Sequence, residues 1–158
     1  MKPLLEIYVD ADACPVKEEI QRVAKRYQLS VTYVANTRMR LPDSETAKLV
    51  VVEGKFDEAD NWIVGHVNCN DLVVTSDIPL AYRCIQKGAK VLGSTGHPFT
   101  EDNIGHLLAT RDLMAELREA GTLTGGGPAP FQKQDRSRFL HTFDQMIQAI
   151  KREEKQRP

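Results

Sequence analysis

The sequence predicts an α/β fold of three layers, in which a mostly parallel five-stranded sheet is covered by helices. Two observations predict it. Short aliphatic runs alternate with segments whose apolar residues recur at helical spacing, a pattern typical of strands joined by helical crossovers. The chain has 158 residues, of which 41% are hydrophobic and 27% charged, as expected for one globular domain with its own core.

Residues 1–99 are expected to form the α/β core. Apolar runs predict strands over 5–9, 31–35, 49–52, 72–75 and 89–92. We expect the first helix to begin at Pro15 with Cys14 as its cap, because proline is favoured at the first helical position. Further helices are expected over 59–67 and over 79–86, the latter ending before Gly88. Helices between successive strands imply right-handed crossovers and a parallel sheet.

Residues 100–158 are expected to be a helical extension that packs on this core, so that 1–158 is a single domain. Thr100 can cap a helix that ends at Gly121, and a glycine-rich loop over 124–131 follows. The last helix carries one apolar face, made of Phe139, Phe143, Met146, Ile147 and Ile150. Two helices alone bury too little surface to fold independently.

Composition excludes several classes of protein. The longest aliphatic run, 49–52, is far shorter than the ~20 residues of a membrane helix. Acidic residues occupy the N-terminal stretch where a signal peptide would be apolar, so we expect a cytoplasmic protein with no membrane partner. Three cysteines without a CxxC unit support neither a disulfide framework nor a zinc ribbon. The sequence leaves the oligomeric state open.

Acidic residues follow two of the predicted strands. Asp10 and Asp12 come after the first strand, Asp77 follows the fourth, and Asp60 opens the helix before the fourth. In a parallel sheet, ligands bind beyond the carboxyl ends of the strands where the strand order reverses. If the first and fourth strands are neighbours, these carboxylates share one cleft. Such an all-oxygen set selects Mg²⁺ or Mn²⁺. The alternative is that the same residues only cap helices.

Basic and polar residues near these strand ends are candidate phosphate ligands. They are Lys17, Asn36, Arg136 and Arg138, with the glycine run 125–127 as a possible source of backbone N–H donors. Residues 53–77 hold six acids against one base, whereas 133–158 hold seven bases and four acids. This distribution suits a metal site beside a phosphate-binding flank, although uneven solvated charge explains it as well.

Several motifs resemble the YaiI/YqxD family of bacterial proteins over nearly the whole chain. They are VDADACPVK at 9–17, VAN at 34–36, DEAD at 57–60, TSDIPLA at 75–81, TGGG at 124–127 and DRSRF at 135–139. The resemblance implies a PIN-like fold, in which acids bind divalent metal for RNA or DNA cleavage. Asp10, Asp60 and Asp77 match positions of PIN metal ligands. The acid that PIN nucleases carry after the second strand has no clear counterpart, and Asp12 or Asp57 could substitute.

Three hypotheses of function follow. The first is an Mg²⁺- or Mn²⁺-dependent nuclease of single-stranded RNA or DNA, with Asp10, Asp60 and Asp77 as catalytic metal ligands and Asp12 as an added ligand. The second is a non-catalytic module of PIN-like fold that binds nucleic acid or nucleotide phosphate. The third is a thiol enzyme that uses Cys14, since a helix N-terminus lowers the pKa of a thiol.

Overall fold

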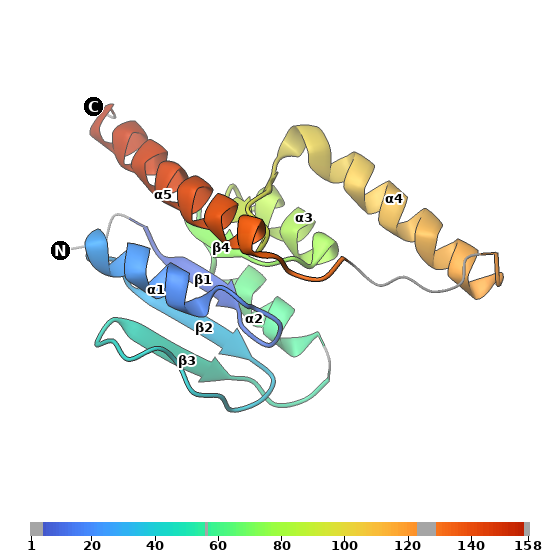
Figure 1. Cartoon of the computed structure of the whole chain (residues 1–158), viewed down its shortest axis with the longest axis horizontal. Helices are drawn as coiled ribbons and strands as arrows, with labels where there is room; N and C mark the ends of the chain where they lie inside the picture. The colour runs from blue at the N-terminus through green and yellow to red at the C-terminus, as the bar shows by residue number, and fades with distance from the viewer. Residues whose placement is uncertain (1–4, 56, 123–128, 157–158) are drawn as a thin grey trace.

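The computed structural model describes residues 5–55, 57–122 and 129–156 and has an α/β architecture (Figure 1). The strands are β1 (Ile7–Asp10), β2 (Val31–Ala35), β3 (Ala47–Val51), β4 (Leu72–Val74), β5 (Lys90–Leu92) and β6 (Pro98–Phe99). The helices are α1 (Lys17–Arg26), α2 (Glu58–His66), α3 (Ile78–Gln86), α4 (Glu101–Glu119) and α5 (Lys133–Gln156). The predicted α/β class and alternation of elements are confirmed.

The sheet has six strands in the order β3-β2-β1-β4-β5-β6. Strands β1 to β5 pair in parallel, and β6 pairs with β5 in antiparallel orientation. The prediction of five strands missed β6, because a two-residue strand shows no apolar period. The strand order reverses between β1 and β4, so their carboxyl ends form the point where an open α/β sheet offers a binding crevice.

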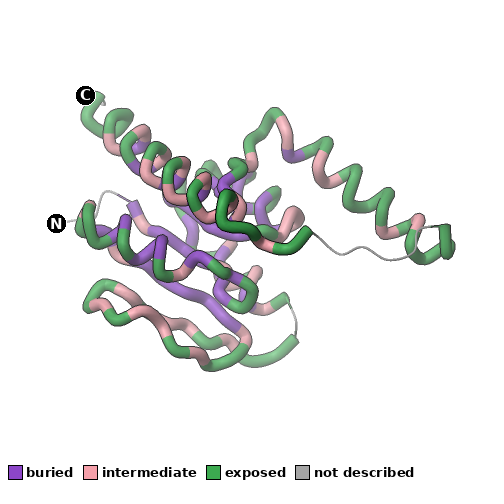
Figure 2. The backbone as a smooth tube through the Cα atoms, in the orientation of Figure 1, coloured by how far each residue is buried: buried purple, intermediate pink, exposed green. Residues whose placement is uncertain are grey.

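Side chains alternate between two apolar layers on the faces of the sheet. Ile7 and Val9 of β1 belong to one buried cluster, which includes residues of α1 and α5. Tyr8, between them, belongs to the other cluster, which includes residues of α2 and α3. The central strands are buried in both directions (Figure 2), as expected of a parallel sheet covered on both faces. The three-layer prediction is therefore confirmed.

The two C-terminal helices differ in how they meet this core. Helix α5 buries Phe139, Phe143, Ile147 and Ile150 against the layer that contains α1, as its sequence predicts. Helix α4 begins at a capping box between Thr100 and Asn103 and buries only Ile104. It then extends away from the body of the molecule (Figure 1). The expectation that the C-terminal helices pack on the core is met by α5 along its apolar face and by α4 through Ile104 and its contact with α3.

The start of α1 also differs from prediction. The helix begins at Lys17 rather than Pro15, and its N-cap residue is Val16, whose side chain makes no cap hydrogen bond. Neither Asp10 nor Asp12 caps this helix. The segment before it is thus a loop that leads from the carboxyl end of β1, and this loop carries Asp12 into the region described next.

Candidate metal centre

The first acidic position lies at the junction of β1 and β4. Asp10 is the last residue of β1, and Thr75 follows the end of the neighbouring β4. The Thr75 hydroxyl donates to Oδ2 of Asp10 at 2.9 Å and accepts from the backbone N–H of Asp77 at 3.0 Å. Thr75 is 2% exposed. This buried hydroxyl therefore holds the two acidic segments in a fixed relation.

Asp77 is both a helix cap and a member of this site. Its Oδ1 accepts from the backbone N–H of Leu80 at 3.0 Å, which caps α3. The capping alternative considered for Asp77 is therefore correct, and this cap uses one of the two carboxylate oxygens.

Asp12 and Asn36 close the other side of the site. The backbone N–H of Asn36 donates to Oδ2 of Asp12 at 2.7 Å, and the Thr37 hydroxyl donates to Oδ1 at 3.3 Å. Asn36 directly follows β2. The ends of β1 and β2 are thus tied together through one carboxylate.

All four acids line a single cavity of about 340 Å³. The other lining residues are small or polar, and they are Ala13, Asn36, Ala59, Ser76 and Ser94. Asp60 enters from the first turn of α2. The structure thus brings Asp10, Asp12, Asp60 and Asp77 together from separate segments of the chain. Sequence reasoning missed the serines and Thr75, although their positions at the ends of β4 and β5 could have indicated them.

Crowding of carboxylates changes their protonation. The pKa of Asp60 is raised to about 6, first by burial and then by the charges of Asp77 and Asp10. The pKa of Asp10 is also raised, mainly by burial, and the charges of Asp77 and Asp12 add to the rise against the opposing hydrogen bond from Thr75. In the described part of the chain, no Lys or Arg forms an ion pair with any of these four acids. The site therefore carries uncompensated negative charge.

The donor set is suited to a hard cation, but the side chains are not already closed around one. Carboxylate and hydroxyl oxygens are the ligands that Mg²⁺ and Mn²⁺ prefer. Within the described residues, no group of three or more His, Cys, Asp or Glu side chains is disposed to hold an ion as it stands. An ion bound here would take further ligands from water or from a rotated carboxylate.

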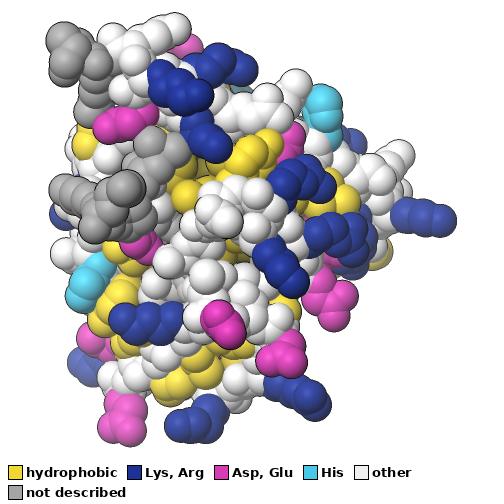
Figure 3. Space-filling view, turned by 90° about the vertical axis from the view of Figure 1, so that its left-hand side faces the viewer, with side chains coloured by type: hydrophobic (Ala, Val, Ile, Leu, Met, Phe, Trp, Pro, Cys, Tyr) yellow, Lys and Arg dark blue, Asp and Glu magenta, His cyan; other side chains and the backbone are white. Residues whose placement is uncertain are grey.

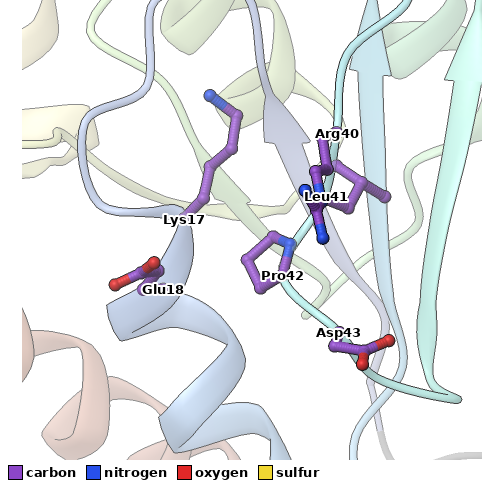
Figure 4. Close-up of a pocket in the computed structure, with 6 residues that line it drawn as sticks. All are labelled: Lys17, Glu18, Arg40, Leu41, Pro42 and Asp43. Atoms are coloured by element: carbon purple, nitrogen blue, oxygen red, sulfur yellow. The ribbon is translucent and has the colours of Figure 1, made fainter.

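The predicted phosphate ligands divide into two sets. Asn36 lines the acidic cavity, and Lys17 lines a neighbouring cleft (Figure 4). Arg136 pairs with the buried Glu19 at 2.7 Å, and Arg138 pairs with Asp135 at 3.1 Å. Neither arginine lines the acidic cavity. The glycine run 125–127 lies outside the described residues.

Arg136 and Arg138 instead tie α5 to the rest of the fold. Arg136 also donates to the carbonyl of Pro15 at 3.1 Å, directly before α1. Arg138 donates to the carbonyl of Thr95 at 3.0 Å, in the loop after β5. Both arginines therefore have structural partners that are distant in sequence, and no local pattern indicates these pairings.

The thiol expected to be reactive is buried. Cys14 is 8% exposed, and burial raises the pKa of its thiol. The expectation of a lowered pKa is wrong, because burial outweighs the opposing effects of the Val16 backbone N–H and of the Lys17 charge. A buried thiol with a raised pKa is a poor nucleophile, so the geometry does not favour a thiol enzyme.

No described helix is both long enough and apolar enough to cross a bilayer.

Residues 8–149 match the profile of the family described as "Uncharacterized BCR, YaiI/YqxD family". A UPF0178 protein of Rhodospirillum centenum is 53% identical over 94% of this chain and 99% of its own length. One from Parvibaculum lavamentivorans is 54% identical over 94% and 97%. No solved structure matches. The chain therefore belongs to the YaiI/YqxD family.

Proposed function

We propose that the protein is a divalent-metal-dependent phosphodiesterase that cleaves single-stranded RNA or DNA in the cytoplasm, as its resemblance to PIN-like nucleases suggests. The observation that carries the proposal is the meeting of four carboxylates in one cavity at the strand-order reversal. Asp10, Asp60 and Asp77 would hold Mg²⁺ or Mn²⁺, and Asp12 would be an added ligand. A bound ion offsets the repulsion that raises the pKa of Asp60.

Each residue then has a distinct role. A divalent ion, when bound, lowers the pKa of water and stabilises charge on a phosphoryl oxygen. Thr75 fixes Asp10 relative to the Asp77 backbone. Asn36, with its N–H bound to Asp12, presents its side chain at the rim of the cavity, where it would orient the phosphodiester. Asp60, from the first turn of α2, would complete the ligand set with Asp10 and Asp77.

A second candidate is a non-catalytic module that binds nucleic acid or nucleotide phosphate through the same edge of the sheet. One observation favours it. The described acids do not stand in a closed coordination sphere, and one oxygen of Asp77 is already occupied by the cap of α3. A protein of this fold that does not bind metal tightly would show the same arrangement of acids.

Cleavage assays separate these candidates. Fluorescein-labelled 20-nucleotide RNA and DNA single strands are incubated with the protein in Mn²⁺, Mg²⁺ or EDTA. Asp60→Asn and Asp77→Asn are the test variants, since asparagine caps a helix about as well as aspartate. Asp112→Asn, on the exposed part of α4, is the matched control.

We expect slow cleavage with Mn²⁺ that EDTA abolishes. Turnover should be lost in both test variants and kept in the control. Binding of the strands without cleavage in any metal would favour the binding module. Cleavage that is equal in the variants and the wild type would refute the proposed site.

A further inference from the structure

A second cleft lies beside the acidic cavity, between the start of α1 and the segment that follows β2. It has a volume of about 500 Å³ and is lined by Lys17 and Glu18 of α1 and by residues 40–43 (Figure 4). Lys17 and Arg40 project from its two walls. Neither of the functions argued above assigns this cleft, and Arg40 is not part of the acidic site.

The walls of the cleft are held in place by a buried polar network. The Tyr33 hydroxyl donates to the Gln21 side chain at 3.0 Å and to the carbonyl of Lys17 at 3.3 Å. The amide nitrogen of Gln21 donates to the hydroxyls of Ser44 at 2.9 Å and Thr46 at 3.2 Å. This network joins β2, α1 and the 44–46 segment, so the cleft is preformed.

Apolar anchors fix the direction of Arg40. Met39 and Leu41, its neighbours in the chain, pack against the core cluster. Successive side chains of an extended segment point to opposite sides, so Arg40 and Arg38 are left exposed. The position of Arg40 at the cleft therefore follows from the burial of the residues on either side of it.

Lys17 and Arg40 are available to a ligand in a way that Arg136 and Arg138 are not. Among the described residues, neither Lys17 nor Arg40 forms an ion pair with a carboxylate. The Lys17 ammonium donates to the carbonyl of Cys14 at 3.0 Å, which orients it without neutralising it. Two acids, Glu18 and Asp43, also line the cleft, but Lys17 extends away from both (Figure 4).

The cleft and the acidic cavity share one edge of the sheet. Asp12 and Asn36 line the acidic cavity and are hydrogen-bonded to each other. The chain runs from Asp12 to Lys17 on one side and from Asn36 to Arg40 on the other. The opposite edge of the sheet, from which the strands start, carries interspersed acidic and basic side chains (Figure 3). A polyanion crossing the acidic cavity would thus meet unpaired cations on leaving it toward β2.

We infer that the Lys17–Arg40 cleft binds the phosphodiester backbone of a single-stranded nucleic acid, next to the phosphate held at the acidic cavity. This inference rests on the proposed function for the identity of the polyanion. Among the described residues, no aromatic side chain lines the cleft, so the contact is to phosphates rather than to stacked bases and is independent of sequence. The strand therefore lies over the carboxyl ends of β1 and β2, and Arg136 and Arg138 do not hold it.

Binding is measured in Mn²⁺ by fluorescence anisotropy, with every variant made on the Asp77→Asn background so that cleavage does not interfere. The probes are fluorescein-labelled 20-nucleotide oligo(dT) and oligo(rU) between 50 and 200 mM salt. The slope of log K against log salt is negative. Each lost phosphate contact makes it less steep by about 0.7 for single strands. Lys17→Gln and Arg40→Gln should each show this change, and the double variant should show about twice as much.

Two controls belong to the test. Arg40→Lys should keep the wild-type slope. Lys90→Gln, an exposed lysine at the start of β5 on the opposite edge of the sheet, should also leave it unchanged. All variants should have the melting temperature of the wild-type protein, since neither Lys17 nor Arg40 forms an ion pair within the described structure.

Wild-type slopes in Lys17→Gln and Arg40→Gln, or no binding of either oligonucleotide, would overturn the inference. The inference would also be overturned if uridine monophosphate displaced the labelled oligonucleotide as well, mole for mole, as the unlabelled oligonucleotide does. The cleft would then be a site for a free nucleotide. Failure of the proposed nuclease looks different. Strands would then bind with the predicted slopes, and no metal would support cleavage.

Discussion

Replacing Asp60 by Asn tests whether repulsion between the carboxylates of the acidic cavity destabilises the folded protein. The pKa of Asp60 is raised from 3.8 to about 6, first by burial and then by the charges of Asp77 and Asp10. A carboxyl whose folded pKa lies above its unfolded value binds its proton more tightly in the native state. Its contribution to stability is therefore fully present below pH 4 and is lost as the pH rises through 6.

The size of the effect follows from the same shift. Each pKa unit corresponds to about 1.4 kcal/mol, so a fully shielded group would cost about 3 kcal/mol. Asp60 is half-buried, and solvent screens the charges around it, so we expect about 1 kcal/mol. In a protein of this size this is about 2–4 °C in Tm. Asp60→Asn cannot ionise and should not show this loss.

The assay is thermal unfolding of wild type and Asp60→Asn between pH 4 and pH 7.5, first in EDTA and then with Mn²⁺. Relative to its value at pH 4, the variant should gain about 1 kcal/mol over wild type at pH 7.5 in EDTA. With Mn²⁺ at 100 times its Kd, wild type should be stabilised by about 2.7 kcal/mol and the variant by less. The advantage of the variant over wild type at pH 7.5 should therefore shrink when Mn²⁺ is added.

Two results together would contradict the prediction for Asp60→Asn. One is a stability difference between wild type and Asp60→Asn that does not change with pH in EDTA. The other is an equal response of both proteins to Mn²⁺. Asp112→Asn, an exposed acid on α4, should stay within about 0.5 kcal/mol of wild type under every condition.

Four further predictions concern positions outside the metal ligands. Thr75→Val should destabilise by about 1–3 kcal/mol and abolish metal-dependent cleavage, whereas Thr75→Ser should restore both. Arg136→Met should lower the free energy of unfolding, measured in urea, by about 2–3 kcal/mol. The reason is that Glu19, whose side chain is 7% exposed, loses its partner. Adding Glu19→Gln should recover part of this loss. Gly96→Ala should cost at least about 2 kcal/mol, since φ is +89° and the new Cβ would lie 2.6 Å from backbone. Iodoacetamide at neutral pH should leave Cys14 unmodified in the native protein, as peptide mass mapping would show.

Local pattern was sufficient for most of the elements. Strand β2 occupies the predicted residues 31–35, because an apolar run bounded by polar residues leaves little choice of boundary. The capping of α4 by Thr100 and the positive φ of Gly121, +73°, were also visible in the sequence. These features depend on residues within one turn of each other, which is why a single sequence can specify them.

Features that depend on distant contacts were harder to predict. The partner of Arg136 lies 117 residues away, so no local pattern could identify it. Helix α4 carries apolar residues at helical spacing, yet its later turns extend from the body of the fold. The start of α1 was misplaced by two residues, and the burial that raises the pKa of Cys14 depends on packing that no local pattern shows.

The candidate site stands between these two cases. The four acids could be named from their positions at strand and helix ends, but their meeting required β1 and β4 to be neighbours. Lys17 could be named from the sequence as a phosphate ligand, but its meeting with Arg40 in one cleft depends on the burial of Met39 and Leu41 and on the Gln21 network. Of the four predicted phosphate ligands, Arg136 and Arg138 of α5 are bound within the fold.

The most direct test of the central claim is an anomalous-scattering crystal structure of the protein soaked in Mn²⁺. The account predicts an ion in the acidic cavity with oxygens of Asp10 and at least one of Asp60 and Asp77 within about 2.0–2.6 Å. An acidic cavity without an anomalous peak at saturating Mn²⁺ would contradict it.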